Sequence, residues 1–239
     1  MTELAVSEVF GPTVQGEGPS AGRRAWFVRL GRCNLDCAWC DTPYTWDWKG
    51  KLGVAYDPAT EVRRMDLDAV ARLLPTEADG ALLVVTGGEP MLQAGALLRL
   101  VQWAAFDGWD VEVETNGTRE PAAALAAYAR FNVSPKLAHS GVDQAQAIVP
   151  QALEAFAALA MVGRATFKFV VQQPSDLDEV DSLVLRFNIP DSAVWVMPEG
   201  RSALEVAVGL GSVARPAIER GWNVSNRLHV QLWGDRRGV

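Results

Sequence analysis

Short apolar runs rich in β-branched residues alternate along the chain with longer segments in which apolar positions recur at helical spacing. The short runs predict strands at residues 26–30, 82–86, 110–115, 166–171 and 193–197, with a weaker strand at 131–134. The longer segments predict helices at residues 66–74, 91–106, 121–129, 150–160, 175–187 and 202–220. A last strand is expected around residues 223–232.

Several predicted helices begin at residues that suit a helix start. Pro121 and Pro150 fit a first helical turn, and Ser202 precedes Glu205 at capping-box spacing. The alternation of strands and helices predicts a parallel sheet, in which loops at the carboxyl ends of the strands form the site. The chain of 239 residues is long enough for one α/β domain over residues 1–239.

Charge and composition narrow the classes of partner. The chain carries 22 Lys and Arg against 29 Asp and Glu, a formal net charge of −7. This excess of acid gives no electrostatic basis for nonspecific binding, so we expect no nucleic-acid partner. The first residues lack a basic signal segment, and no run approaches the roughly 18 to 20 apolar residues of a membrane span. We therefore expect a cytoplasmic protein without membrane contact, in a compartment that keeps thiols reduced.

The three cysteines, Cys33, Cys37 and Cys40, have the spacing C-x3-C-x2-C. A structural zinc site normally has four ligands and a disulfide framework an even number of thiols, so neither fits well. A 4Fe-4S cluster fits better, because three thiolates leave one of its four irons open to a substrate or cofactor. Three alternatives stay open: zinc completed by His139 or His229, incidental buried thiols, and a zinc or iron-sulfur module that only mediates an interaction.

This cysteine spacing, followed by Asp41 and Thr42, resembles the radical S-adenosylmethionine superfamily. The resemblance implies a single α/β domain with a partial (β/α)6 barrel, some helices of which are shortened. Its cluster loop, about 31–56, follows the first barrel strand. The resemblance also implies a 4Fe-4S cluster whose open iron is chelated by S-adenosylmethionine. Trp39 then lies beside the adenine, and Asp41 lies on the cofactor side.

Further motifs end predicted strands. Glycines in residues 85–90, VTGGEP, let the backbone approach a ligand, and the Glu89 carboxylate can accept hydrogen bonds from an ammonium group. This resembles the superfamily's GGE motif, which implies that Gly88 and Glu89 contact the amino group of S-adenosylmethionine. By the same resemblance Glu114, in residues 113–118, lies beside cofactor and substrate and is expected to be catalytic. The other expected cofactor residues are Ser134, Pro135, Lys136, Gln173, Pro174, Ser175 and Asp176.

These strand-end segments also have simpler interpretations. Residues 113–118 can form an Asn-Gly turn, and Lys136 can point into solvent. Ser175 can cap a helix after a Pro turn. His139 lies in a loop-like stretch, where we expect it to be solvated. It is the cysteine spacing that favours the cofactor interpretation of the motifs.

The glycine-rich segment at 10–20, FGPTVQGEGPS, suggests a backbone that faces a ligand. Together with 27–34 and 228–234, it resembles the 7-carboxy-7-deazaguanine synthase family, from about residue 7 to the end of the chain. That family converts 6-carboxy-5,6,7,8-tetrahydropterin to 7-carboxy-7-deazaguanine, with loss of ammonia, by a radical ring contraction that leads to queuosine and other deazapurines. The alternative enzyme is a glycyl-radical-enzyme activase, which shares the cysteine spacing and would act on a protein.

Substrate contacts follow from the family resemblance. It implies that Val14, Gln15 and Gly16 present backbone and amide groups to the edge of the pterin. Arg29 is expected to hold the substrate carboxylate, because a guanidinium binds a carboxylate through two parallel hydrogen bonds. Thr86 is expected to be a second substrate contact.

The resemblance extends to a metal ion, the C-terminus and partners. The family's magnesium requirement points to Thr42, since Mg2+ keeps several waters and takes few protein ligands. His229, expected on the final strand, is a further substrate contact. The strand and tail at about 223–239 are expected to pack over the substrate side, with the terminal carboxylate of Val239 on the pterin. We also expect a homodimer and an external electron donor of the flavodoxin or ferredoxin type.

Overall fold

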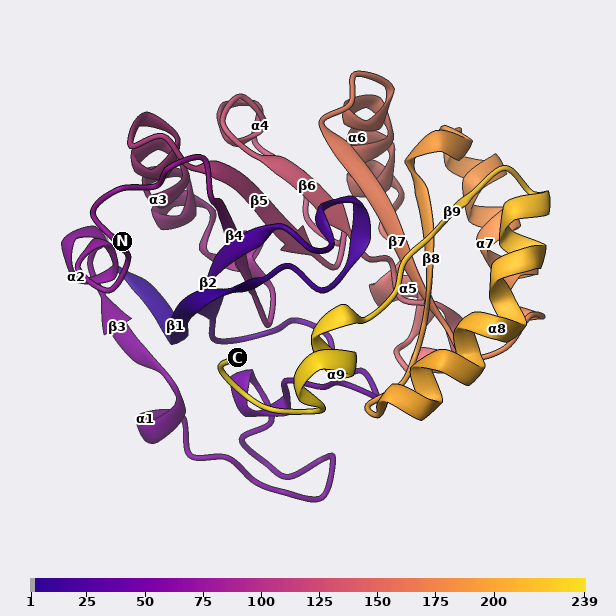
Figure 1. Ribbon diagram of the computed structural model, residues 1–239, viewed down its shortest axis with the longest axis horizontal. Coiled ribbons are helices and arrows are strands. Elements are labelled where there is room, and N and C mark those ends of the chain that lie inside the picture. Colours follow the sequence, from indigo (N-terminus) through magenta and orange to yellow (C-terminus); the bar gives the residue numbers. More distant parts are fainter. Residues whose placement is uncertain (1–2) are drawn as a thin grey trace.

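The computed structural model describes residues 3–239. Their strands form one open sheet in the order β3-β1-β2-β4-β5-β6-β7-β8-β9 (Figure 1). The strands are β1 Leu4–Val14, β2 Arg24–Leu30, β3 Arg63–Met65, β4 Leu82–Gly87, β5 Asp110–Thr115, β6 Arg130–Val133, β7 Ala165–Val171, β8 Val194–Pro198 and β9 Asn223–Val224.

Six strands, β2 and β4 to β8, run parallel to one another and form the body of the sheet. Their sequences read as nearly continuous apolar runs because a parallel sheet is covered on both faces. The antiparallel strands β1 and β3 extend one edge, and the short parallel strand β9 extends the other. This arrangement confirms the predicted partial (β/α)6 barrel.

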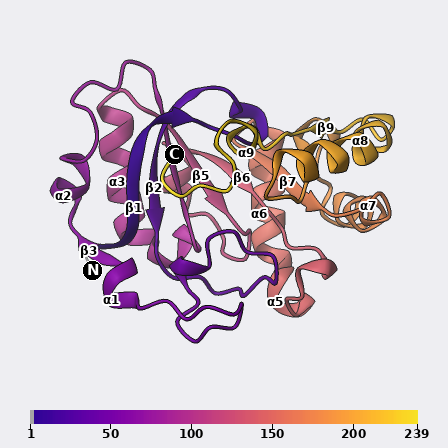
Figure 2. The ribbon, with the colours of Figure 1, turned by 60° about the horizontal axis from the view of Figure 1, so that its bottom comes forward.

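Helical segments separate the parallel strands and cover the outer side of the sheet (Figures 1 and 2). The capping box at Ser202 and Glu205 starts α8 as predicted. None of the helices in residues 3–239 is both long and apolar enough to cross a membrane. The helices are α1 Pro58–Glu61, α2 Leu67–Ala71, α3 Ala94–Phe106, α4 Ala123–Ala126, α5 Gln144–Ala147, α6 Pro150–Met161, α7 Asp176–Phe187, α8 Ala203–Glu219 and α9 Leu228–Trp233.

Two predicted helices are shorter than the sequence suggested. The helix expected over 66–74 spans only α2, capped by the side chain of Asp66, and Pro75 follows soon after its end. The helix expected over 121–129 is reduced to α4, in which Leu125 is buried and its alanine neighbours are largely exposed. Helices of this size have little apolar surface to bury, so packing does not extend them.

Strand β1 was not predicted from the sequence. Its first residues, Leu4 to Ser7, are buried, whereas the second half is partly exposed and contains Gly11 and Pro12. Pairing with β2 on one side and β3 on the other holds this segment extended. A sequence pattern carries no direct signal for such long-range pairing.

The strand predicted over 223–232 is wrong beyond residue 224. The alternating apolar and polar residues of 228–233 form α9 instead. The Ser225 hydroxyl donates to the carbonyl of Asn226, whose side chain accepts from the backbone N–H of Arg227, so the chain turns directly after β9. Helix α9 then lies across the open side of the barrel, between β1 and the end of β8 (Figures 1 and 2).

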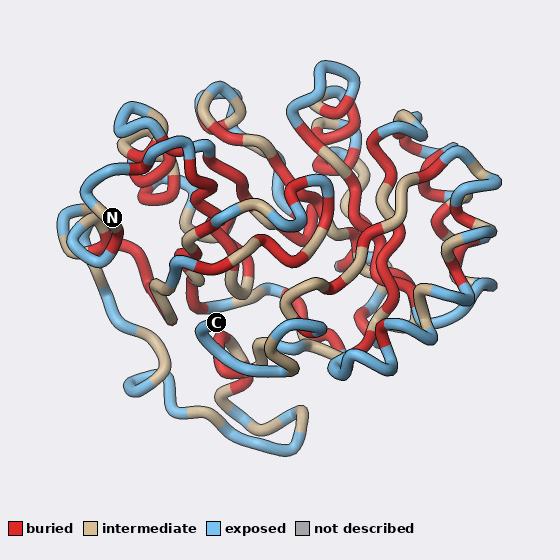
Figure 3. The backbone as a smooth tube through the Cα atoms, in the orientation of Figure 1, coloured by how far each residue is buried: buried red, intermediate tan, exposed pale blue. Residues whose placement is uncertain are grey.

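Burial follows the two faces of each strand. The strands are mostly buried, and exposed residues concentrate on the outer helices and on the long loop after β2 (Figure 3). On β5, Val111 and Val113 join the core beneath the helices, while the intervening side chains face the barrel interior. The main core therefore lies between sheet and helices. A smaller apolar cluster of Ala25, Phe27, Leu82 and Val84 packs on the inward positions of β2 and β4, and polar residues line much of the remaining interior.

Candidate functional site

Alternate positions of the parallel strands line a cavity of about 900 Å3 inside the barrel. Arg29 of β2, Thr86 of β4, Glu114 of β5 and Lys168 of β7 all reach it. Each occupies an inward position because its strand neighbours pack outward against the helices. The carboxyl ends of neighbouring strands thus gather polar side chains from distant parts of the sequence.

The three thiols line one side of this cavity. Cys33, Cys37 and Cys40 follow β2 and are free. Burial raises the pKa of all three thiols, that of Cys33 to about 12, and a bound metal would favour their thiolate forms. The backbone N–H of Leu35 donates to Cys33 Sγ at 3.4 Å, and the Trp46 indole donates to Cys40 Sγ at 3.2 Å. Such donors to sulfur are typical of iron-sulfur sites.

The donor set fits a 4Fe-4S cluster. Within residues 3–239, no three His, Cys, Asp or Glu side chains converge on a point that would hold a single ion. A cube takes each thiolate on a different iron, so its ligands surround a larger volume. Three thiols on the wall of a large cavity fit this donor set, and the cavity would leave room for a further ligand at the cluster.

Two glycines let the cluster loop pack on the end of β4. A Cβ on Gly87 would lie 2.1 Å from the carbonyl oxygen of Leu30. One on Gly88 would lie 2.0 Å from the carbonyl oxygen of Arg32, next to Cys33. Both glycines also line the cavity. Their lack of a side chain therefore allows close packing against the cluster loop, at the same place where the sequence predicted a close approach of the backbone to a ligand.

Glu89 is buried and lies outside the cavity lining. Its carboxylate accepts hydrogen bonds from the Met91 N–H at 2.9 Å, the Thr115 hydroxyl at 2.8 Å and the Asn116 N–H at 2.7 Å. Burial raises the pKa of this carboxyl group. The structure uses Glu89 to join the ends of β4 and β5, and its expected contact with S-adenosylmethionine stays a prediction.

Trp39 lines the cavity beside two basic residues. Lys136 Nζ lies 5.7 Å from its ring centroid, and the His139 ring stacks on it at 5.9 Å. The indole nitrogen of Trp39 is buried and has no hydrogen-bond partner within residues 3–239, which leaves a donor for a ligand. The prediction of a solvated His139 is wrong: the stack covers its ring, and Nε2 lies 3.0 Å from the carbonyl oxygen of Val170.

The remaining cofactor residues divide into two groups. Ser134 and Lys136 line the cavity, and the Lys136 ammonium donates to the Ser134 carbonyl at 2.7 Å and hydroxyl at 2.8 Å. Pro135, between them, is buried outside the lining. Asp176 accepts from the Gln172 N–H at 2.8 Å and closes the turn before α7. It lies outside the cavity lining with the exposed residues Gln173, Pro174 and Ser175, and no side-chain cap bond from Ser175 is present in this described segment.

Gln15 lines the cavity, but its side chain and backbone already form hydrogen bonds within the protein. Its side-chain NH2 donates to Glu112 at 3.2 Å and to Glu114 at 3.1 Å. Its backbone pairs with Arg23 and Gly22, at 2.9 and 2.8 Å. Gln15 therefore shapes the wall of the cavity, and its contact with a pterin stays a prediction.

Other predicted substrate residues also line the cavity. The Thr86 hydroxyl donates to Glu114 at 2.7 Å, which fixes this carboxylate at the cavity wall. Val14 ends β1, and Gly16 packs so closely on His229 that a Cβ would lie 1.9 Å from its Nδ1. His229 therefore reaches the cavity from α9, not from a strand. Burial lowers its pKa, which favours the neutral ring.

Arg29 joins a cluster that reaches the C-terminal tail. Its Nε donates to Glu8 at 3.0 Å, while its terminal nitrogens make no hydrogen bond within residues 3–239 and are left for a ligand. The Tyr44 hydroxyl and Arg237 donate to the same Glu8 carboxylate. Arg237 also lies 3.8 Å above the Tyr44 ring, so the tail is anchored over the site with Val239 in the cavity lining.

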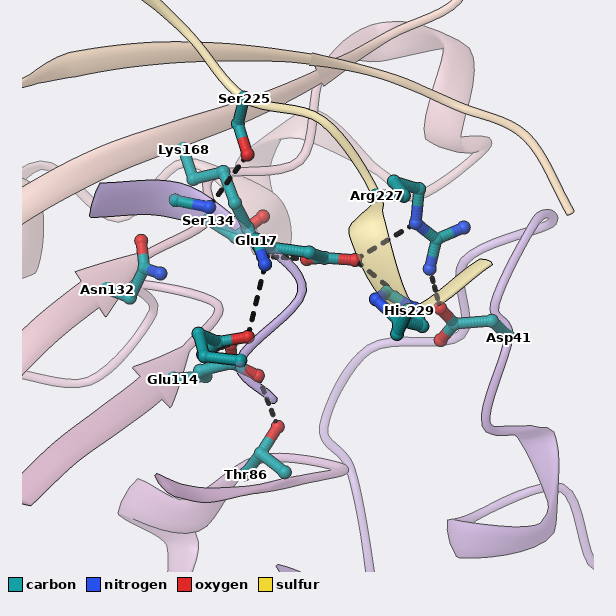
Figure 4. A network of polar contacts seen from close by, with 12 residues as sticks. Glu17, Asp41, Thr86, Glu114, Asn132, Ser134, Lys168, Ser225, Arg227 and His229 are labelled. Carbon is teal, nitrogen blue, oxygen red and sulfur yellow. Dashed lines mark hydrogen bonds and ion pairs between the residues drawn. The ribbon is translucent and has the colours of Figure 1, made fainter. Parts of the chain in front are cut away.

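The sequence did not single out a buried ionic network at this site. Figure 4 shows the Glu17 carboxylate among Lys168, Arg227 and His229. Burial alone would raise the pKa of Glu17, but Lys168 and Arg227 hold it well below its usual value. Arg227 also pairs with Asp41 at 2.5 Å. One sequence signal was available: Lys168 is a lone charge in the apolar run of β7.

Thr42 lies at the cluster end of the cavity. Its hydroxyl is 3.8 Å from Cys40 Sγ, and it lines the cavity together with Asp41. One hydroxyl can serve an ion that keeps most of its waters. The magnesium contact at Thr42 stays a prediction.

Comparisons with known proteins agree with this geometry. The family model described as "Radical SAM superfamily" matches residues 28–172. A 7-carboxy-7-deazaguanine synthase from Pyrobaculum aerophilum is 35% identical, over 98% of this chain and 97% of its own. One from Halobacterium salinarum is 36% identical, over 97% and 91%. The crystal structure of QueE from Escherichia coli covers 96% of both chains, with a TM-score of 0.69 and 25% identity.

The fold, the three thiols and the family match define a radical S-adenosylmethionine enzyme. Membership of that superfamily implies a 4Fe-4S cluster and S-adenosylmethionine as cofactors. The identity of over 30% with full-length relatives is more specific. The chain belongs to the 7-carboxy-7-deazaguanine synthase family.

Proposed function

We propose that this chain converts 6-carboxy-5,6,7,8-tetrahydropterin to 7-carboxy-7-deazaguanine with loss of ammonia. The observation that carries the proposal is a single cavity lined both by three free thiols and by the segment that resembles a pterin site. Family membership supports the same reaction. An interaction module would not need these two features in one cavity.

Residues on the cluster side hold the cofactors in this proposal. Cys33, Cys37 and Cys40 ligate iron, while Trp39 and Lys136 flank S-adenosylmethionine. When bound, the reduced cluster and S-adenosylmethionine supply the radical that removes a hydrogen atom from C6 of the pterin. The buried, unpartnered indole nitrogen of Trp39 supports a ligand on that side.

Residues on the opposite wall bind and orient the pterin. The free terminal nitrogens of Arg29 hold its carboxylate, and Glu8 fixes the guanidinium from behind. Glu114 and the terminal carboxylate of Val239 accept hydrogen bonds from the N–H groups of the ring. The anchored tail excludes water from the reacting face. A buried hydrogen-bonding edge of this kind rejects wrong ligands strongly, because they leave polar groups unpaired.

We extend the proposal to one Mg2+ held by the Thr42 hydroxyl and the substrate carboxylate. The position of Thr42 in the cavity lining, near Cys40, supports this role. A hard ion with most of its waters retained needs no cluster of protein ligands. It would neutralise the substrate carboxylate together with Arg29.

The proposal includes an external donor of the flavodoxin or ferredoxin type and a homodimer. The free thiols support a reducing, cytoplasmic setting in which such donors operate. A stripe on α8 supports association of two copies: Leu204, Val208 and Ile218 are 73%, 65% and 63% exposed and share one face of the helix.

Anaerobic reconstitution tests the proposed function. Replacing any one of Cys33, Cys37 and Cys40 with Ala should abolish S-adenosylmethionine cleavage, because two thiolates do not hold the cube with one iron open. Cleavage retained in any single variant would contradict the cluster assignment. Formation of 5′-deoxyadenosine only with a protein substrate, and not with the pterin, would favour the glycyl-radical activase instead.

A further inference from the structure

Arg227 joins three segments that lie far apart in the sequence. It precedes α9 and is only 7% exposed. Its Nε donates to Glu17 at 2.9 Å, its Nη2 to Asp41 at 2.5 Å and its Nη1 to the carbonyl of Gly200 at 2.6 Å. Figure 4 shows the guanidinium between the two carboxylates. All three edges of the planar group are therefore occupied.

Two of the joined segments carry the two halves of the site. Glu17 belongs to residues 15–18 on the pterin side, and Asp41 directly follows Cys40 on the cluster side. Among the hydrogen bonds of the described chain, none joins residues 15–18 directly to residues 33–42. Arg227 is the polar connection between these segments.

The need to neutralise the buried Glu17 carboxylate does not by itself explain why an arginine stands at position 227. Lys168 already pairs with the second oxygen of Glu17, so this carboxylate has a buried cation without Arg227. What Arg227 adds is the link from Glu17 to Asp41. A planar guanidinium can meet acceptors in three fixed directions, whereas an ammonium is a point charge on a flexible stem.

We propose that Arg227 is a positioning residue that fixes the cluster loop relative to the pterin segment. The inference rests on the proposed function and deepens it. Arg227 acts through Glu17 and Asp41, and it sets the distance between S-adenosylmethionine and the pterin. Without it, S-adenosylmethionine would be cleaved at a normally loaded cluster, but fewer cleavage events would lead to product.

Arg220 provides a matched control. Its Nε donates to Asp181 at 2.8 Å, its Nη2 to Asp178 at 3.0 Å and its Nη1 to the Pro216 carbonyl at 3.1 Å. This guanidinium also bridges two carboxylates and one carbonyl. It lies between α7 and α8, outside the cavity lining, so its loss tests the effect of a broken ion-pair bridge alone.

The test compares Arg227→Lys and Arg227→Gln with Arg220→Lys and Arg220→Gln in anaerobic turnover. We expect the Arg227 variants to form about tenfold more 5′-deoxyadenosine per product than wild type, because small misplacements in an active site are costly. Iron content should stay at the wild-type level. In the metal-free protein, hydrogen exchange at residues 37–42 should rise in the Arg227 variants and not in the Arg220 variants.

Each outcome decides the proposal. A wild-type ratio of 5′-deoxyadenosine to product in both Arg227 variants overturns it, even if hydrogen exchange rises. If neither Arg227 variant folds, Arg227 is a determinant of folding and the positioning role is also overturned. If the wild-type enzyme leaves the pterin unchanged, the proposed function has failed. In that case hydrogen exchange still tests the link: a rise at residues 37–42 in the Arg227 variants alone would support it, and no rise would contradict it.

Discussion

Gly88→Ala should displace Cys33, the first of the three proposed cluster ligands. The added Cβ would lie 2.0 Å from the carbonyl oxygen of Arg32, 2.4 Å from its carbonyl carbon and 2.9 Å from the nitrogen of Cys33. Real Cβ atoms do not approach closer than 3.0 Å, so the carbonyl oxygen has to move by about 1 Å. The colliding atoms are backbone, so no side-chain rotation relieves the contact. The shift would also disturb the 2.8 Å hydrogen bond from the Glu89 N–H to this oxygen.

A displacement of this size at a reacting centre costs about 100-fold in rate. We therefore expect Gly88→Ala to lower both iron content after reconstitution and 5′-deoxyadenosine formation, the latter by about 100-fold. Gly211→Ala is the matched control, since a Cβ there meets nothing within 4 Å, and it should stabilise α8 by about 0.5–1 kcal/mol. Iron content and turnover at wild-type levels in Gly88→Ala would refute the claim that packing of the loop on β4 positions Cys33.

Four further predictions test the wall and mouth of the cavity. Arg29→Lys should lower kcat/KM for the pterin by about tenfold or more, because an ammonium does not reproduce two parallel hydrogen bonds; unchanged kinetics would remove Arg29 from the site. Thr42→Val should abolish stimulation by Mg2+ while the cluster absorbance persists, and an unaltered magnesium response would reject Thr42 as a ligand. Deleting residues 235–239 should raise KM for the pterin more than KM for S-adenosylmethionine, with iron content preserved. The pKa of Glu17 is lowered from 4.5, so wild-type stability should fall as the pH drops below that value, and Glu17→Gln should show a smaller loss in thermal unfolding between about pH 6 and pH 3; equal losses would contradict the ion pairs of Glu17.

The barrel was predictable because its strands are buried on both faces. β4 and β7 read as apolar runs that need no knowledge of their neighbours. The cysteine motif was also predictable from the sequence alone. Its three residues lie within one loop, so their spacing can be read without knowledge of the fold. The predicted cluster loop therefore follows β2 in the structure, as expected.

Features that depend on distant partners were missed. β1 is held by pairing on both sides, and α9 forms because the chain turns at Ser225 and finds no further strand partner after β9. The network around Glu17 joins residues from the N-terminal segment, β7 and the C-terminus, so no local pattern could bring Lys168 and Arg227 together. The internal hydrogen bonds of Gln15 and Glu89 were missed for the same reason, because only the fold supplies their partners; the ligand contacts expected of these two residues stay predictions.

Anaerobic turnover with the authentic pterin tests the central claim most directly. The reconstituted enzyme would be incubated with 6-carboxy-5,6,7,8-tetrahydropterin, S-adenosylmethionine and a strong reductant, and the products identified by mass. We predict 7-carboxy-7-deazaguanine together with an equimolar amount of ammonia. Recovery of unchanged pterin, while S-adenosylmethionine is cleaved at a fully loaded cluster, would contradict the assignment of this cavity to pterin ring contraction.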